Sequence, residues 1–383
     1  MKRIRLALCA LLFAALPAQA QVERAYLGTY TFAPGRGSAP GSRGEGIYLT
    51  ELDAKTGKLS APRLVAQSPS PSWVTVDGKL GVLYAANEAG GGEAGVSAFR
   101  IDRATGGLTP IGKVALPGPV HLALAPGGGW LVAASFGGSL NLIRLKPDGA
   151  PDAVAQSIRM EGAIKPSQVK EPVGNQWAAY RDQTRAHGSF FHPDGRHLVM
   201  NDYGLDELVV FALENGQMRL VSRNGQFPGS ATRHSAWNAR GNLLYSVSEQ
   251  DSMVTVSAFN PATGTLTERQ RISALPKNYQ GSAAAGEIVL SKDGRNLYVT
   301  NRFYNSIAHF RVGANGLLTY GGDTMTAANH PRMLVTDPSG RWLMAGGQNN
   351  DTIAIYRIGP NGTPQPVGTT AAPTPVSLAF FGD

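Results

Sequence analysis

One hairpin-like segment recurs along the chain and constrains its fold more than any other feature. In the clearest copy, residues 284–302, an apolar run leads into the turn Lys292-Asp293-Gly294 and then into a second apolar run that ends at Arg302. Two short β-rich runs joined by a glycine-bearing turn are typical of a β-hairpin. Further copies begin at Pro71, Val120, His187, Arg233 and Pro331.

Aligning the second strand of each copy gives seven equivalent strands, which end 46 to 67 residues apart. The last residues of these strands are Tyr30, Glu88, Phe136, Tyr203, Glu249, Arg302 and Gln348. A repeat of this length, with about four strands per unit, indicates the blades of a β-propeller. The 47 glycines and 25 prolines are spread along the chain, as many short strands with frequent turns require. We therefore predict an all-β fold.

The two ends of the chain predict how the ring closes. The first repeat begins with a second strand at Tyr26, with no first strand before it, and residues 375–381 form a first strand with no second strand after it. Pairing these strands would complete one blade and leave no open sheet edge. We therefore predict a single seven-bladed propeller domain over residues 21–383. The longest repeat contains an insertion, about residues 159–184, which is either a lid over one face or a decoration.

Residues 1–20 are predicted to be a secretory signal peptide. Lys2, Arg3 and Arg5 precede an apolar run that is too short to span a bilayer, and Ala18-Gln19-Ala20 follows as a cleavage site. The one cysteine of the chain, Cys9, lies within this segment. The mature protein is thus expected to be periplasmic or secreted, without disulfides or a thiol nucleophile.

Composition and motifs exclude several functions. The net charge is +8, of which the signal peptide supplies three, and no Lys/Arg run of the kind that follows a phosphate backbone is present. We expect no nucleic-acid binding and no membrane span. The mature chain has no P-loop, G-x-S-x-G or H-E-x-x-H motif, and its histidines lack metal-ligand spacing. We therefore expect no metal site and no cofactor. No feature of the sequence predicts the oligomeric state.

Two sets of equivalent positions should converge at one mouth of the central channel. They are the start of each first strand and the end of each second strand. A single charged residue at a strand end is usually a surface charge, but here charged residues and histidines recur in successive repeats, where pKa shifts are expected. These residues are His187, Arg233, His234, Glu249, Glu287, Arg302 and Arg332, and Glu88 occupies an equivalent position.

The repeats together resemble a known family, the propeller-type lactonases. The similar segments include GIYLTELDAKTGKL, AHGSFFHPDGRHLVMNDYGLD, TRHSAWNARGNLLYSVSEQDS and GEIVLSKDGRNLYVTNRFYNSIAHF, which occur in order, one per repeat. The family includes bacterial 6-phosphogluconolactonase and is similar to the fungal carboxy-muconate lactonizing enzyme. The resemblance implies lactone chemistry in the channel without a required metal, and a small-molecule lactone, including anionic ones, as the ligand.

The resemblance implies four catalytic residues, His187, Arg233, Glu249 and Arg302. Substrate contacts are expected from His234, Glu287, Arg332 and Glu88. Lactone hydrolysis needs a base to activate water and a cation to stabilise the oxyanion. Glu249 or His187 is the candidate base, and Arg233 and Arg302 would hold the oxyanion or a substrate carboxylate or phosphate.

The predicted export favours an unphosphorylated sugar lactone or another lactone, because phosphorylated sugar lactones are cytoplasmic metabolites. The alternative function is a non-catalytic periplasmic propeller that binds or scaffolds a partner, since fold does not fix function. A broad apolar patch on the outer face would favour this alternative.

Overall fold

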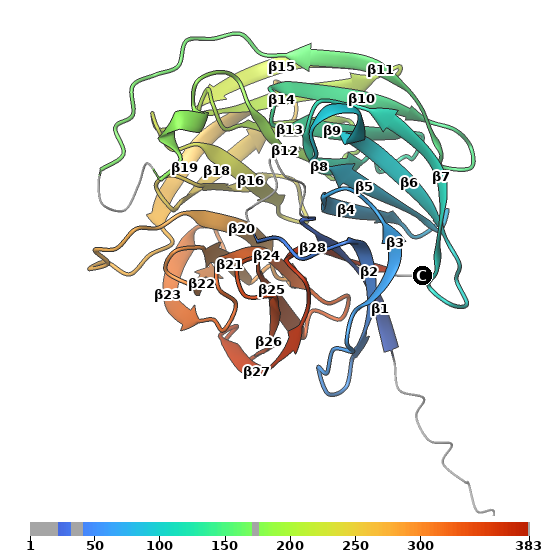
Figure 1. Ribbon diagram of the computed structural model, residues 1–383. Coiled ribbons are helices and arrows are strands. Elements are labelled where there is room, and N and C mark those ends of the chain that lie inside the picture. Colours follow the sequence, from blue (N-terminus) through green and yellow to red (C-terminus); the bar gives the residue numbers. More distant parts are fainter. Residues whose placement is uncertain (1–21, 32–40, 171–175, 382–383) are drawn as a thin grey trace, which may run out of the picture.

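The computed structural model describes residues 22–31, 41–170 and 176–381. Seven four-stranded antiparallel sheets surround a central axis, which confirms the seven-bladed propeller (Figure 1). The predicted signal peptide, residues 1–20, lies outside the described residues. None of the helices in the described ranges is long and apolar enough to cross a membrane.

Each blade consists of four strands, which are numbered below in order from the axis outward. Blades 1 to 4 are β28 (Pro375–Phe381), β1 (Val22–Thr29), β2 (Gly46–Asp53), β3 (Arg63–Gln67); β4 (Pro71–Asp77), β5 (Val82–Asn87), β6 (Gly95–Ile101), β7 (Leu108–Ala115); β8 (Pro119–Leu124), β9 (Trp130–Ser135), β10 (Ser139–Leu145), β11 (Pro151–Arg159); and β12 (Ala186–Phe191), β13 (His197–Asp202), β14 (Glu207–Glu214), β15 (Gln217–Gly225).

Blades 5 to 7 follow the same order. They are β16 (Thr232–Trp237), β17 (Leu243–Ser248), β18 (Met253–Asn260), β19 (Thr265–Ser273); β20 (Ala285–Leu290), β21 (Asn296–Asn301), β22 (Ser306–Val312), β23 (Leu318–Met325); and β24 (Pro331–Thr336), β25 (Trp342–Gly347), β26 (Thr352–Ile358), β27 (Pro364–Ala371). Two short 3₁₀ helices, η1 (Gly91–Glu93) and η2 (Ala178–Tyr180), lie in loops.

The ring closes as the two chain ends predict. β28 pairs antiparallel with β1, and Leu27 lies opposite Leu378. This pairing gives blade 1 its inner strand, so strands from both ends of the chain complete one sheet (Figure 1). Every blade of the closed ring therefore has all four strands.

The hydrophobic core lies between the blades. Seven clusters of buried residues each join two neighbouring blades, and the last of the ring joins blade 7 to blade 1. The alternating side chains of the middle strands supply both faces of each sheet to these clusters. Burial of apolar surface between sheets thus holds the ring together.

Buried tyrosines of four second strands also tie their blades to the next. Tyr298 of β21 donates a hydrogen bond to the Gly362 carbonyl oxygen of blade 7 at 2.7 Å. Equivalent bonds run from Tyr26, Tyr84 and Tyr245 to glycine carbonyls of the following blade. In blade 7 the Trp342 indole takes this role and donates to the Ala54 carbonyl of blade 1 at 3.0 Å.

We predict that Tyr298→Phe lowers the free energy of unfolding by about 1 kcal/mol, because it leaves the buried Gly362 carbonyl without this donor. Urea denaturation measures the change. Tyr180→Phe is the matched control, since this ring is half exposed and should lose almost nothing. Equal midpoints for both variants and the wild type would show that the inter-blade bond contributes no stability.

Candidate functional site

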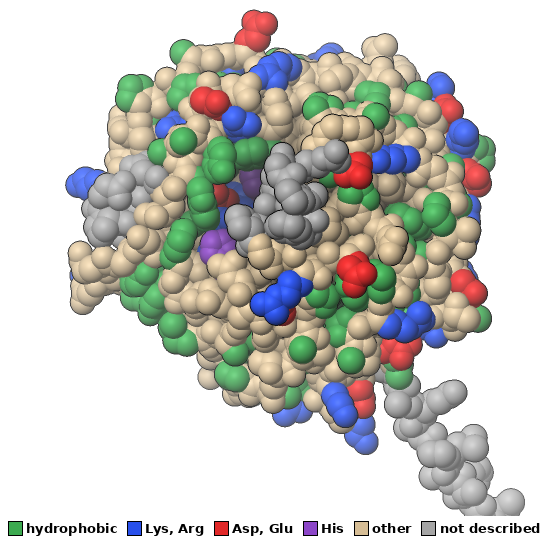
Figure 2. Space-filling view, in the orientation of Figure 1, with side chains coloured by type: hydrophobic (Ala, Val, Ile, Leu, Met, Phe, Trp, Pro, Cys, Tyr) green, Lys and Arg blue, Asp and Glu red, His purple; other side chains and the backbone are tan. Residues whose placement is uncertain are grey.

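The predicted site residues converge at one end of the central channel. In the orientation of Figure 1, Figure 2 shows a hollow near the centre of this face where histidine, acidic and basic side chains gather, with hydrophobic side chains along its border. The starts of the inner strands and the ends of the second strands supply these residues. We call His187, Arg233, His234, Glu249, Glu287, Arg302, Arg332 and Glu88 the mouth cluster.

The inner strands position their share of the cluster through β-bulges. Near the start of every inner strand the pairing with its neighbour shifts, so that extra residues have no opposite partner. In blades 4 to 7 these extra residues include His187, Arg233, Glu287 and Arg332. A bulge re-aims side chains that a regular strand would alternate between two faces. It allows the consecutive Arg233 and His234 both to reach the cluster.

The Glu249 carboxylate binds two arginines. Its Oε2 lies 3.0 Å from Arg233 Nε and 2.5 Å from Arg302 Nη2. Its Oε1 accepts a hydrogen bond from the Tyr203 hydroxyl at 3.2 Å. All four side chains are buried, and such charges are tolerated only when they are paired and hydrogen-bonded. The network therefore fixes the two guanidinium groups next to each other.

His234 and Glu287 form a buried imidazole–carboxylate pair. Nδ1 of His234 lies 2.8 and 2.9 Å from the two oxygens of Glu287. Arg233 Nη1 lies 3.1 Å from the same nitrogen and donates to the Gly286 carbonyl at 2.6 Å. Burial raises the pKa of Glu287, although Arg233 acts against this change. Burial, and then Arg233, lowers the pKa of His234 well below 6.5, so the imidazole is neutral at pH 7.

Three imidazoles of the inner strands pack together. The ring of His234 lies 5.1 Å from that of His187 and 5.1 Å from that of His121. Burial, followed by neighbouring charges, also lowers the pKa of His187 and His121 well below 6.5. Nε2 of His234 and of His121 and Nδ1 of His187 are buried and have no hydrogen-bond partner among the described residues. Three buried imidazole nitrogens of this cluster are thus not engaged by any described residue.

Arg332 and Glu88 form another ion pair of the cluster. Arg332 Nη2 lies 3.7 Å from Glu88 Oε2, and the guanidinium lies 5.2 Å from the centre of the Tyr30 ring. The Tyr30 hydroxyl donates to the same Glu88 oxygen at 2.8 Å. Within the described ranges this ion pair is the closest polar contact of the Arg332 side chain, so Arg332 is the least engaged arginine of the cluster.

The mouth cluster adjoins a cleft of about 770 Å³ between blades 2 and 3. Glu88, Phe136 and Arg185 line it, together with backbone around Gly90 and Gly118. Its volume is in the range of small-molecule sites. A sugar-sized ligand could therefore contact the cluster and the cleft together.

A second cavity, of about 570 Å³, lies at the other end of the channel and is lined by the inner strands. Trp73, His121 and Phe190 line this cavity and also contact the His234 ring. This aromatic layer therefore separates the second cavity from the mouth cluster.

The structure brings all eight predicted residues together, and it adds others. Four further residues contact the cluster and also lie at the start of a first strand or the end of a second strand. They are Trp73, His121, Tyr30 and Tyr203, and only their contacts distinguish them from the other residues at such positions. Phe190 and Trp177 were missed. Trp177, in the insertion, stacks on Arg302, with the guanidinium carbon 4.4 Å from the ring centre. No sequence signal identified it, because the insertion has no counterpart in the other repeats.

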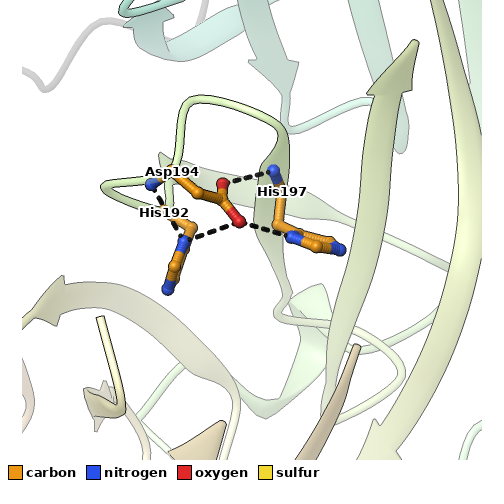
Figure 3. Close-up of side chains that lie close together, drawn as sticks. All are labelled: His192, Asp194 and His197. Carbon is orange, nitrogen blue, oxygen red and sulfur yellow. Dashed lines mark hydrogen bonds and ion pairs between the residues drawn. The ribbon is translucent and has the colours of Figure 1, made fainter. Parts of the chain in front are cut away.

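Three ligand-type side chains also gather in the turn between β12 and β13 (Figure 3). One atom each of His192, Asp194 and His197 lies within 4.8 Å of the others, the one such group in the described residues. The carboxylate oxygen Oδ2 of Asp194 lies 2.7 Å from His197 Nδ1. The backbone N–H of Asp194 donates to His192 Nδ1 at 3.1 Å. His192 Nε2 lies 2.9 Å from the Gly241 carbonyl oxygen. Hydrogen bonds of the turn account for this group, which the histidine spacing had not indicated.

Backbone geometry also marks the mouth. His330, immediately before β24, has a φ of 58°, and Ala231, before β16, has a φ of 56°. Such left-handed residues are uncommon outside glycine and often occur at functional sites. His330 also contacts the ring of Trp177. Burial, followed by Arg302 and Arg332, lowers the pKa of His330 to about 3.

We predict that His330 makes the protein less stable in acid. The unfolded chain protonates this imidazole near pH 6.5 and the folded chain near pH 3, so the unfolded state binds more protons between these values. The free energy of unfolding should therefore decrease as the pH is lowered through this window, by up to about 1.4 kcal/mol per pH unit for this group. His330→Asn, which tolerates the left-handed backbone, should reduce the slope.

Urea titrations of wild type and His330→Asn across this window measure the effect. Identical slopes for the two proteins would contradict the assignment of a buried neutral His330.

Comparisons with known proteins agree with this architecture. The family described as "Lactonase, 7-bladed beta-propeller" matches residues 24–380. The chain is 28% identical over 335 residues to a 6-phosphogluconolactonase of Bacillus subtilis, covering 86% of this chain and 90% of that protein. It is 27% identical over 282 residues to a 6-phosphogluconolactonase of Pectobacterium carotovorum, covering 72% of this chain and 78% of that protein.

A solved structure is also similar. The periplasmic gluconolactonase PpgL of Pseudomonas aeruginosa superposes with a TM-score of 0.82 at 26% identity, covering 94% of this chain and 99% of that one. The family match spans nearly the whole described chain, and its seven blades are those of the structure. The protein belongs to the seven-bladed β-propeller lactonase family.

Proposed function

We propose that the protein is an exported, metal-independent lactonase that hydrolyses an unphosphorylated sugar-type lactone at the mouth cluster. The observation that carries the proposal is the buried set of arginines, carboxylates and neutral imidazoles at one end of the channel. Membership of the lactonase family supports it. Relatives named 6-phosphogluconolactonase and periplasmic gluconolactonase support a sugar lactone as the substrate.

His234 is the general base in this proposal, in place of Glu249 or His187. In this arrangement the Nδ1–H of His234 donates a hydrogen bond to the Glu287 carboxylate, which leaves the lone pair on Nε2. A carboxylate that fixes the tautomer of a catalytic imidazole is a recurrent arrangement in hydrolases. Glu249, by contrast, has its oxygens engaged by Arg233, Arg302 and Tyr203. Its proposed role is to hold the two arginines.

The reaction then needs one proton carrier. His234 Nε2 takes a proton from water as the water oxygen bonds to the lactone carbonyl carbon. The guanidinium groups of Arg233 and Arg302 stabilise the oxyanion of the tetrahedral intermediate. The ring C–O bond breaks, and the proton on His234 passes to the departing ring oxygen, giving the hydroxy acid. Arg332, the least engaged arginine, binds the carboxylate of the hydroxy acid product.

The alternative of a non-catalytic binding propeller has less support. Among the described residues, the exposed large hydrophobic side chains of the outermost strands number at most one in each blade. They are Leu64, Val154, Leu220, Met325 and Val367. They do not form the broad apolar patch on which a scaffold would rely.

We predict that purified protein beginning at residue 21 opens D-glucono-1,5-lactone faster than buffer does. His234→Asn keeps a donor toward Glu287 but removes the Nε2 lone pair, so kcat should fall at least about 100-fold. His187→Asn and Glu249→Gln test the other candidate bases. His309→Asn, a histidine outside the mouth cluster, is the matched control and should retain activity. A pH-stat assay measures the acid released.

The assay is run before and after dialysis against EDTA, because the proposed reaction uses no metal. A loss of activity that added Zn²⁺ or Ca²⁺ restores would overturn metal independence. If neither free nor phosphorylated aldonolactones are opened, the lactonase proposal fails in favour of the binding propeller. Full activity in His234→Asn with loss in His187→Asn would move the base to His187.

A further inference from the structure

The insertion between β11 and β12 is anchored to the propeller by a buried ion pair. Arg181 Nη2 pairs with the Asp206 carboxylate, and both side chains are almost fully buried. The same guanidinium nitrogen donates to the Lys165 carbonyl at 3.1 Å, across the insertion. Asp206 also accepts the backbone N–H groups of Gly229 and Ala231 at 2.8 and 2.7 Å. The segment next to Trp177 is therefore fixed to blades 4 and 5.

Trp177, close to this anchor in the sequence, contacts residues of blades 5, 6 and 7. Its backbone N–H donates to Gln250 Oε1 of blade 5 at 3.3 Å. Its ring packs on Phe303 of blade 6 and on His330 at the start of blade 7, with ring centres 5.3 and 6.0 Å apart. The indole also lies against the guanidinium of Arg302.

Arg302 is held on one edge by polar groups and on its face by Trp177. Its Nη2 contacts Glu249 at 2.5 Å and the Ala285 carbonyl at 2.9 Å, whereas its Nε has no hydrogen-bond partner within the described ranges. Two contacts to one nitrogen leave the guanidinium plane free to tilt. Stacking on an aromatic ring fixes such a plane.

Gln250 links the same tryptophan to the other side of the ion pair. Gln250 Nε2 donates to the Tyr203 hydroxyl at 2.5 Å, and this hydroxyl donates to Glu249 at 3.2 Å. Trp177 thus contacts Arg302 directly and Glu249 through Gln250 and Tyr203.

We infer that Trp177 is a positioning residue that holds Arg302 in its oxyanion-binding orientation, so that the described segment of the insertion around Trp177 is part of the site. This inference rests on the proposed lactonase function for its kinetic consequence, but the contact itself also predicts how the site binds anions. The indole acts through Arg302 and takes no part in bond making or breaking.

The test compares Trp177→Phe, Trp177→Leu and Trp177→Ala. Phenylalanine keeps an aromatic face for the Arg302 guanidinium, whereas leucine keeps a bulky side chain without an aromatic face. We expect Phe to stay near the wild-type kcat, and Leu and Ala each to lose about tenfold in kcat with little change in KM. If Trp177→Leu has the same kcat as Trp177→Phe, the Trp177 ring only fills space and its aromatic face does not position Arg302. If all three match the wild type, the insertion is decoration. Either result overturns the inference.

A double-mutant cycle separates this inference from the lactonase proposal. Titration calorimetry gives the Kd for D-gluconate in wild type, Trp177→Leu, Arg302→Ala and the double variant. If Trp177 acts through Arg302, Trp177→Leu weakens binding about tenfold in the wild type and has no further effect once Arg302 is gone. Additive losses overturn the inference, and so does unchanged binding in Trp177→Leu. A wild type that opens no lactone but shows this coupling would refute only the lactonase proposal.

Discussion

The bulge near the start of each inner strand is the constraint on which the site depends. A regular strand sends successive side chains to opposite faces, so Arg233 and His234 could not both serve one cluster. The register shift between Thr232 and His234 removes this restriction, and equivalent shifts occur in all seven inner strands. The fold thus offers seven equivalent points at one end of the channel, and blades 4 to 7 use them for polar side chains.

Burial then determines the chemistry of these side chains. Charges removed from water are costly unless they are paired, and Glu249, Arg233 and Arg302 satisfy this condition together. The same burial, aided by the arginines, keeps the imidazole of His234 neutral at pH 7. A neutral imidazole beside fixed cations can accept a proton while the cations stabilise a developing oxyanion. Preorganisation of this kind needs a rigid ring, which the inter-blade cores and the pairing of β28 with β1 provide.

The repeat pattern was enough to predict much of this structure. Seven equivalent second strands and two unmatched ends predicted the blade number and the closure, because each blade repeats one hydrophobic pattern. The same alignment placed Glu249 and Arg233 at one mouth of the channel, since both occupy recurrent positions. The bulges could not be predicted, because they directly follow the first paired residue of these strands, where too few residues precede them to reveal a shift in the alternating pattern. Trp177 could not be predicted either, because its place depends on the path of an insertion that no other blade repeats.

A crystal structure of the protein soaked with D-gluconate, the product of the proposed reaction, tests the central claim most directly. The account predicts electron density in the mouth cluster, with the carboxylate near Arg302, Arg233 or Arg332 and the rest of the molecule toward the cleft at Glu88 and Phe136. Density only in the second cavity, beyond Trp73 and His121, or no density at a concentration that saturates binding, would contradict it.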